Sequence, residues 1–328
     1  MQGRAAVNRT GLVTVFGGSG FLGHYAVRAL AKEGWRIRVA LRRPHLAPEL
    51  RVMGDVGQIE LHQANVRVAD SVSEALAGAD AVVNLIGILY ESGKQTFQAM
   101  HVDASDLIAK SASAAGAQRM VQVSAIGADI NSPAVYARTK AAGETAVRAA
   151  MPNATILRPS VVFGEEDQFF NRFAAMALVS PALPLIGGGD TRMQPIYAGD
   201  VGGAIAAALS LPEALGQTYE LGGPGVYTFR ELMVLMLKEI GRKRLLVPVP
   251  FPAANLIGTA GDLAARVGFP PPLTTDQVAM LRADNVVPPG ALTLADLGVA
   301  ATALEAVLPT YLWKYRNNGQ FALATERR

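Results

Sequence analysis

Short apolar runs alternate with longer segments of helical spacing over the first half of the chain. A run of apolar or β-branched residues predicts a buried strand, whereas apolar residues at every third or fourth position predict an amphipathic helix. Strands are therefore expected at 12–16, 36–41, 59–64, 81–86 and 119–123. Four helices are expected. One begins near residue 22, a second ends at 76, and two more cover 97–115 and 136–150. This alternation predicts an α/β fold with a doubly wound parallel sheet.

The length of the chain, 328 residues, favours roughly two domains. We expect residues 1–165 to form the first domain, with parts of 190–225 in its core. Residues 166–328 are then expected to form a smaller carboxy-terminal α/β lobe. Because the first domain carries the regular strand and helix pattern, the second is the part expected to face a substrate or a partner.

The stretch from Val13 to Gly23, V-T-V-F-G-G-S-G-F-L-G, changes from strand spacing to helix spacing across a glycine turn. Gly17, Gly20 and Gly23 are spaced by three residues. Such glycines let the chain turn tightly, let a phosphate approach without meeting a Cβ, and let the helix pack on the strand. The N-terminus of the helix presents free N–H groups to a pyrophosphate. The stretch therefore predicts the dinucleotide site of a Rossmann fold.

The end of the second predicted strand carries two cations, Arg42 and Arg43, and no acid nearby. In dinucleotide-binding folds an Asp or Glu at this point binds the ribose hydroxyls of NAD, whereas an Arg accommodates the 2′-phosphate of NADP. The alternative is a solvated basic loop before Pro44. Their position in the unit favours NADPH as the cofactor.

A second chemical signal follows the fifth predicted strand. Ser124 lies at the end of that strand, and Tyr136 and Lys140 are four residues apart at the start of a predicted helix, which places them on one face. A Lys ammonium beside a phenol lowers the pKa of the Tyr, and a Ser hydroxyl can hold a substrate carbonyl. A Tyr and a Lys at this spacing also occur by chance on helix surfaces. The glycine turn upstream favours one common site.

Composition excludes several classes of function. The chain has no Cys, which excludes thiolate catalysis and zinc–thiolate sites, and its four His residues show no ligand spacing, so no metal is expected. The formal charge of +3 comes without a long basic block, so nucleic-acid binding is not indicated. No apolar run reaches the roughly 18 residues of a membrane span, and no secretory signal peptide is recognised.

These motifs resemble the short-chain dehydrogenase/reductase superfamily in its extended or atypical form, over almost the whole chain. The resemblance implies that Ser124, Tyr136 and Lys140 form the catalytic triad. It also implies a nucleotide site made of the glycine turn, the strand ends and the segment after a sixth strand. Its residues are Gly17, Gly18, Ser19, Gly20, Phe21, Leu22, Arg42, Arg43, Asn65, Val66, Ile86, Gly87, Tyr136, Lys140, Pro159 and Val162.

The sequence departs from that superfamily's pattern at three positions. Phe16 stands where Thr is common, Asn65 where Asp is usual, and His101 where many members have Asn. Each departure weakens the transfer of a specific catalytic activity more than the transfer of cofactor binding.

The carboxy-terminal half carries weaker signals. Phenylalanines at helical spacing over 169–176 predict core, and the acidic residues 165–167 predict a solvated loop. Thr228 and Glu231 predict a helix-capping box, and Asp200 predicts the cap of a helix ending near 209. The apolar segment 253–267 is compatible with core, a membrane interface or another subunit, and core is favoured.

Three stretches narrow the resemblance: 163–173, 273–287 and 308–316. They resemble the NADPH-binding accessory subunits of respiratory complex I, in their alphaproteobacterial form. That implies a tightly held NADP(H), docking on peripheral-arm subunits of complex I, and a peripheral position on the cytoplasmic face of the bacterial inner membrane, with possible contact with the membrane surface.

Two other hypotheses stay open. The chain could be a soluble NADPH-dependent reductase, dehydrogenase or epimerase in which Tyr136 donates a proton, Lys140 lowers its pKa and Ser124 orients the carbonyl oxygen. It could also be a free NADP-binding redox sensor that regulates a partner. The complete triad favours an enzyme, and the carboxy-terminal stretches favour the accessory subunit.

Overall fold

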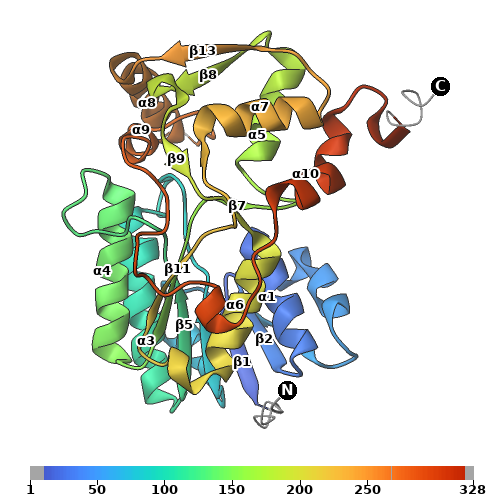
Figure 1. The fold of residues 1–328 in the computed structure, drawn as a ribbon. Coiled ribbons are helices and arrows are strands. Elements are labelled where there is room, and N and C mark those ends of the chain that lie inside the picture. The colour runs from blue at the N-terminus through green and yellow to red at the C-terminus, as the bar shows by residue number, and fades with distance from the viewer. Residues whose placement is uncertain (1–10, 267, 322–328) are drawn as a thin grey trace. The chain divides into compact units, whose positions relative to one another are not determined.

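The computed structural model describes residues 11–266 and 268–321, which fold into two compact units. The first unit comprises 11–158, 199–220 and 291–300. The second comprises 159–198, 221–290 and 301–321. Each unit is therefore assembled from separate parts of the sequence (Figure 1).

The first unit is built on a seven-stranded sheet with the order β11-β6-β5-β4-β1-β2-β3. Strands β1 to β6 pair in parallel, which confirms the doubly wound parallel sheet. The strands are β1 Leu12–Phe16, β2 Arg36–Leu41, β3 Ile59–Gln63, β4 Ala81–Asn84, β5 Arg119–Val123, β6 Thr155–Pro159 and β11 Thr218–Leu221.

The strand order reverses at β1. From β1 the chain continues through β2 and β3 on one side, and it returns to β4 on the other side of β1. Phe16, the last residue of β1, pairs with Ala40 of β2 and with Asn84 of β4, so the carboxyl ends of these strands are neighbours. Ligands of open α/β sheets bind at such a switch point.

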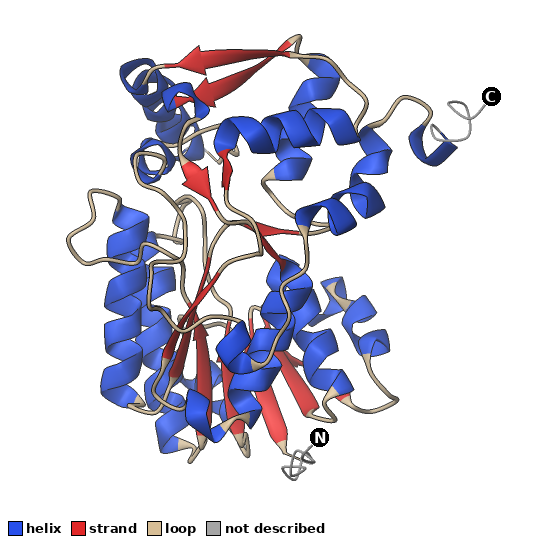
Figure 2. Ribbon diagram, in the orientation of Figure 1, coloured by secondary structure: helices blue, strands red, loops and turns tan. Residues whose placement is uncertain are grey.

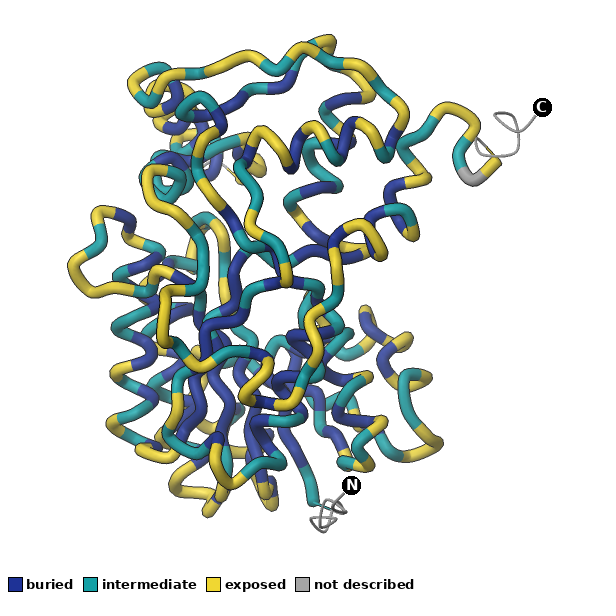
Figure 3. Tube along the Cα trace, viewed as in Figure 1, coloured by how far each residue is buried: buried dark blue, intermediate teal, exposed yellow. Residues whose placement is uncertain are grey.

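Helices cover both faces of this sheet (Figure 2). Residues of α2, α3 and α4 share one buried cluster with strands β4 to β6. On α6, a Cβ at Gly202 would lie 2.8 Å from the carbonyl oxygen of Tyr25 on α1, so these two helices pack closely. With both faces covered, the strands are the most buried part of the unit (Figure 3). The helices are α1 Phe21–Lys32, α2 Ala69–Leu76, α3 Ala104–Ala114, α4 Val135–Ala150 and α6 Ala198–Ser210.

The structure corrects several element boundaries and one cap. Strand β4 ends at Asn84, two residues earlier than predicted, because the chain then turns into a loop bonded to the Asn84 side chain. The predicted helix 97–115 begins as a π-helix, Gln98–Asp103. One predicted cap is wrong, because Asp200 lies inside the first turn of α6 rather than before it.

The second unit combines short two-stranded sheets with helices. A buried cluster joins α5, α7 and α10 with strand β8, and it includes Phe170 of the predicted aromatic core. Thr228 and Glu231 form the predicted capping box of α7. The elements are β7 Val162–Phe163, α5 Phe170–Val179, β8 Ala182–Ile186, β9 Arg192–Met193, β10 Ile196–Tyr197, β12 Tyr227–Thr228, α7 Phe229–Glu239, β13 Leu245–Val249, α8 Phe251–Arg266, α9 Thr275–Met280 and α10 Leu304–Leu312.

Two expectations for the second unit hold only in part. Glu165 and Glu166 are exposed, as predicted for a solvated loop. Asp167 is buried rather than solvated, because its carboxylate accepts hydrogen bonds from the Tyr311 hydroxyl and from backbone N–H groups at the start of α5. Segment 253–266 is not simply core, and residue 267 of the predicted segment lies outside the described residues. In α8 the small residues face α9 and the residues just before it. A Cβ at Gly258 would lie 2.8 Å from the Thr275 nitrogen, and one at Gly261 would clash with the Leu273 carbonyl oxygen. The large residues Leu256 and Leu263 are exposed. Within the described ranges, no helix is long and apolar enough to cross a bilayer.

Candidate functional site

The glycine turn between β1 and α1 has the geometry of a phosphate cradle. Gly17 has a φ of +80°, and a Cβ at Gly23 would lie 2.4 Å from the carbonyl oxygen of Gly18, so both positions require glycine. Gly20 is different. A Cβ there would meet only the Gly17 carbonyl oxygen, at 3.4 Å, and Gly20 is exposed. It is also the N-cap of α1 and makes no side-chain cap.

This turn fits a pyrophosphate. The first N–H groups of a helix need acceptors, and Gly20, the N-cap of α1, has no side chain to supply one. Four further predicted residues lie in the same turn: Gly18 is buried, Ser19 is exposed, and Phe21 and Leu22 are half-buried. The predicted cradle is thus one contiguous, accessible surface at the carboxyl end of β1.

Arg42 and Arg43 follow directly after β2, beside the glycine turn at the same edge of the sheet. Both are exposed. Neither guanidinium has a hydrogen bond or ion pair with another described residue. These are the properties of cations available to an anionic ligand.

Asn65 and Val66 lie in the loop after β3. The Asn65 side-chain oxygen accepts from the backbone N–H of Arg67 at 3.2 Å, and its own backbone N–H donates to the Ser71 hydroxyl at 2.9 Å. Val66 packs against the buried cluster of the first unit. Asn65 therefore shapes the loop with its oxygen, which leaves its amide N–H groups as the part that can meet a base edge.

Ser124 and Lys140 are buried at the carboxyl end of β5. The Lys140 ammonium donates to the Val123 carbonyl oxygen at 3.1 Å, next to Ser124 in the chain. A Cβ at Gly87 would lie 3.5 Å from the Lys140 nitrogen, and Gly87 itself is exposed. The structure thus brings Gly87, Lys140 and the Ser124 segment together.

The polar groups of this corner are not fully satisfied by the chain. The Ser124 hydroxyl is buried and makes no hydrogen bond in the described structure. Burial lowers the pKa of Lys140 to about 8, although the nearby Glu144 carboxylate opposes that shift. A buried hydroxyl and ammonium with unused capacity fit a polar ligand such as the ribose and amide of a nicotinamide nucleotide.

Tyr136 lies on the first turn of α4, with the Lys140 nitrogen 6.0 Å from the centroid of its ring. The phenol ring packs edge-on against His101, with centroids 5.2 Å apart. Ile86, in the loop after β4, donates its backbone N–H to the Asn84 side chain at 3.0 Å. Pro159 and Val162 belong to the second unit, where Pro159 is buried and Val162 pairs with Ile196 in β10.

Sequence reasoning missed the polar residues beneath the site. Asn84 donates to the side chains of Ser105 and Gln122, and all three are buried. The sequence signal that could have found them is a polar residue inside an otherwise apolar strand, as at Asn84 and Gln122. His101 was visible only as a departure from a family pattern, since nothing in the sequence shows the π-helix that holds it.

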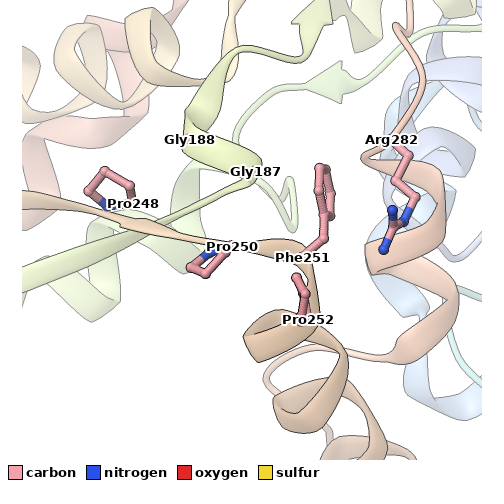
Figure 4. Close-up of a pocket in the computed structure, with 7 residues that line it drawn as sticks. All are labelled: Gly187, Gly188, Pro248, Pro250, Phe251, Pro252 and Arg282. Atoms are coloured by element: carbon pink, nitrogen blue, oxygen red, sulfur yellow. The ribbon is translucent and has the colours of Figure 1, made fainter.

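A pocket of about 560 Å³ lies elsewhere, wholly within the second unit. Figure 4 shows Phe251 between three prolines and Arg282. The Arg282 guanidinium lies 4.3 Å from the centroid of the Phe251 ring. None of the predicted site residues lines this pocket.

Comparison with known proteins gives three findings. The profile of the NAD dependent epimerase/dehydratase family matches residues 13–222. NADH dehydrogenase (ubiquinone) 1 alpha subcomplex subunit 9, a mitochondrial protein of Arabidopsis thaliana, is 39% identical over 97% of this chain and 81% of its own length. A ceramide reductase of Caulobacter vibrioides is 32% identical over 79% of this chain and 78% of its own length.

Among solved structures, a Citrobacter triphenylmethane reductase complexed with NADP(H) has a TM-score of 0.70 at 20% identity. The likeness covers 91% of this chain and 99% of that protein. At this identity it shows the shared fold alone.

Proposed function

This chain belongs to the NAD dependent epimerase/dehydratase family, and from that premise we propose that it is an NADP(H)-binding accessory subunit of respiratory complex I. The observation that carries the proposal is how much of the chain is matched by the Arabidopsis complex I relative. The Arabidopsis complex I relative matches 97% of the chain, second unit included, whereas the family profile ends at residue 222. The nucleotide is proposed to be structural or sensory.

The proposed nucleotide site uses the first unit. The glycine turn holds the pyrophosphate on the N-terminus of α1, and Arg42 with Arg43 holds the 2′-phosphate, which makes the cofactor NADPH rather than NADH. Lys140 and Tyr136 hold the nicotinamide ribose. When bound, the nicotinamide supplies a hydride donor.

The proposed partners are peripheral-arm subunits of complex I, at the cytoplasmic face of the bacterial inner membrane. The second unit is proposed as the partner-facing lobe. Its helix α8 supports this, because Leu256 is 76% exposed and Leu263 is 64% exposed on one helix. Apolar side chains exposed together on a helix favour contact with a partner or a membrane surface.

The experiment is a mild-detergent membrane preparation from which the tagged chain is recovered, co-purifying proteins are identified, and released nucleotide is assayed. We expect complex I subunits and about one NADPH per chain, consistent with one glycine cradle. Arg42→Ala should reduce retained NADPH while partners still co-purify. A chain recovered alone from the soluble fraction would rule out the subunit proposal, and retained NADH would rule out the choice of NADPH.

A second candidate function is supported by the buried, unpartnered Ser124 hydroxyl, a group that a purely structural nucleotide does not need. In this proposal the chain is an NADPH-dependent carbonyl reductase. Ser124 orients the carbonyl oxygen, Tyr136 donates a proton to it, and Lys140 stabilises the phenolate that remains.

This candidate predicts the behaviour of one variant. Tyr136→Phe should lower any carbonyl-dependent oxidation of NADPH by about a hundredfold or more, because general acid catalysis contributes that much. The variant should still hold NADPH through the glycine turn and Arg42, which fluorescence titration of the same preparation measures. Turnover that survives the substitution would exclude Tyr136 as the proton donor.

A further inference from the structure

His101 lies at the centre of contacts that join the loop after β4 to the start of α4. Its side chain is 1% exposed and belongs to the π-helix Gln98–Asp103. Helix α4 packs directly on this turn, since a Cβ at Gly143 would lie 2.1 Å from the His101 carbonyl oxygen. Single π-turns inside helices are frequent at functional sites. Because α4 packs against the His101 carbonyl group, the backbone at this position is held in place independently of the imidazole ring.

Both ring nitrogens of His101 are committed to the protein. The Nε2 atom accepts the backbone N–H of Ile88 at 3.1 Å, so Nε2 carries no proton. The proton of the neutral ring must then lie on Nδ1, which donates to the Thr139 hydroxyl at 3.0 Å. Thr139 in turn donates to the backbone carbonyl of Val135 or Tyr136, at 2.9 and 3.0 Å. One chain of hydrogen bonds thus runs from the Gly87–Ile88 loop to the first turn of α4.

The His101 ring also contacts two aromatic side chains, which adds packing to the hydrogen bonds. The imidazole packs edge-on against Tyr136, and it lies at a tilt over Phe97 with centroids 5.3 Å apart. Burial and the Lys140 charge lower the pKa of His101 to about 3. The ring is therefore neutral at physiological pH, which is the state that the Ile88 hydrogen bond requires.

We propose that His101 is a positioning residue for the nicotinamide end of the nucleotide site, holding the Gly87–Ile88 loop and Tyr136 in their binding geometry. The inference rests on the proposed nucleotide-binding function. His101 acts through the loop backbone and through Tyr136, which are the parts that would meet the ribose and nicotinamide. It leaves the adenine end, with the glycine turn and Arg42, unaffected.

Two variants separate the two hydrogen bonds of the ring. The Gln amide oxygen reaches the place of Nε2, so His101→Gln can still accept from Ile88. The Asn amide nitrogen reaches the place of Nδ1, so His101→Asn keeps only a donor to Thr139. His101→Phe keeps a ring and removes both hydrogen bonds. Thr139→Val removes the partner of Nδ1 without touching the ring.

The test compares two ligands on the full chain: NADPH, and adenosine 2′,5′-bisphosphate, which lacks the nicotinamide half. Loss of a buried hydrogen bond predicts that His101→Asn and His101→Phe bind NADPH about tenfold more weakly. His101→Gln should stay within about threefold of the wild type on the same basis. All variants should bind the bisphosphate as the wild type does.

The ligand comparison also shows how the inference fails. Equal losses for NADPH and the bisphosphate would mean that His101 only supports the fold, and unchanged NADPH binding in His101→Phe would mean that it positions nothing. If the wild-type chain bound neither ligand, the nucleotide function itself would be wrong. Thermal unfolding of each variant, with Thr139→Val as a second probe, identifies any substitution that fails to fold.

Discussion

Single buried polar residues shape the site more than its exposed residues do. Asn84 is fully buried, accepts from the Ile86 backbone and donates to Gln122 and Ser105. A satisfied buried network holds one geometry, because any rearrangement leaves an unpaired group in a low-dielectric interior. Ser124 lies at the end of the neighbouring strand β5 and is the exception, since its buried hydroxyl has no partner in the described structure. The network therefore fixes the strand ends and leaves one polar group for a ligand.

The lowered pKa of Lys140 predicts how the stability of the chain depends on pH. Its pKa is about 8 in the folded chain and 10.5 for a lysine free in water, so the unfolded chain binds more protons between these values. Stability of the nucleotide-free chain should therefore rise as pH increases from about 8 to 10.5. Lys140→Met lacks this buried charge. It should be more stable below pH 8, by at most about 3 kcal/mol, and the difference should shrink through that window.

Chemical denaturation of both chains at about pH 7, 9 and 10.5, values that span the window, measures this difference. The surface variant Lys110→Met is the control, because Lys110 is exposed and pairs with Asp106 within α3. A constant difference between Lys140→Met and the wild type across the window would contradict the lowered pKa of Lys140.

Helix α4 illustrates how an element is held in place. Glu144 on α4 binds Arg158 on β6 through two hydrogen bonds, at 2.8 and 2.6 Å, and Arg158 also binds Glu220 on β11 at 3.0 Å. Two carboxylates raise the pKa of Arg158 above its usual value, chiefly through the Glu144 hydrogen bonds. Glu144 is one turn beyond Lys140, so this ion cluster fixes the helix that carries Tyr136 and Lys140.

Two substitutions in the glycine turn separate the effect of a glycine on stability from its effect on NADPH binding. Gly23→Ala places a Cβ 2.4 Å from the Gly18 backbone, which forces α1 away from the turn. We expect a loss of about 1–3 kcal/mol in unfolding free energy, the usual size of overpacking effects, together with loss of NADPH. Gly20→Ala is the matched variant, because its φ of −90° and the open space suit alanine.

Gly20→Ala should keep the wild-type stability and bind NADPH at least about tenfold more weakly, because the new methyl group meets the approaching pyrophosphate. Thermal unfolding and fluorescence titration on the two variants measure both properties. If Gly20→Ala bound NADPH normally, the phosphate would not lie against this turn.

At the scale of the molecule, the sequence predicts the first unit better than the second. Strands β2 and β5 have the predicted bounds, because apolar residues recur at short spacing along both and are buried in the sheet. The π-helix at His101 was not predictable, because no sequence pattern used for helices distinguishes an i→i+5 turn from an i→i+4 turn. Asp167 was misjudged because its burial depends on Tyr311, which is 144 residues away in the chain.

The stretches that indicated a complex I subunit turn out to hold the second unit together. Asp167 binds Tyr311, and Asn171 binds Tyr315, which joins the 163–173 and 308–316 stretches. Asn285, from the 273–287 stretch, accepts a hydrogen bond from the Ser160 hydroxyl at 2.6 Å. These side chains are used inside the unit, so they do not provide a docking surface.

The exposed apolar side of α8 is one surface of the second unit that is open to that role. Leu256→Glu with Leu263→Glu adds two carboxylates to it, and burying them in an apolar contact costs several kcal/mol. We expect recovery of complex I subunits with the tagged chain to fall at least about tenfold, while NADPH binding and thermal unfolding stay unchanged. Val56→Glu is the control, because Val56 is fully exposed in the first unit. Undiminished recovery with the α8 variant would place the docking surface elsewhere, and an equal loss with Val56→Glu would make the effect one of charge rather than of α8.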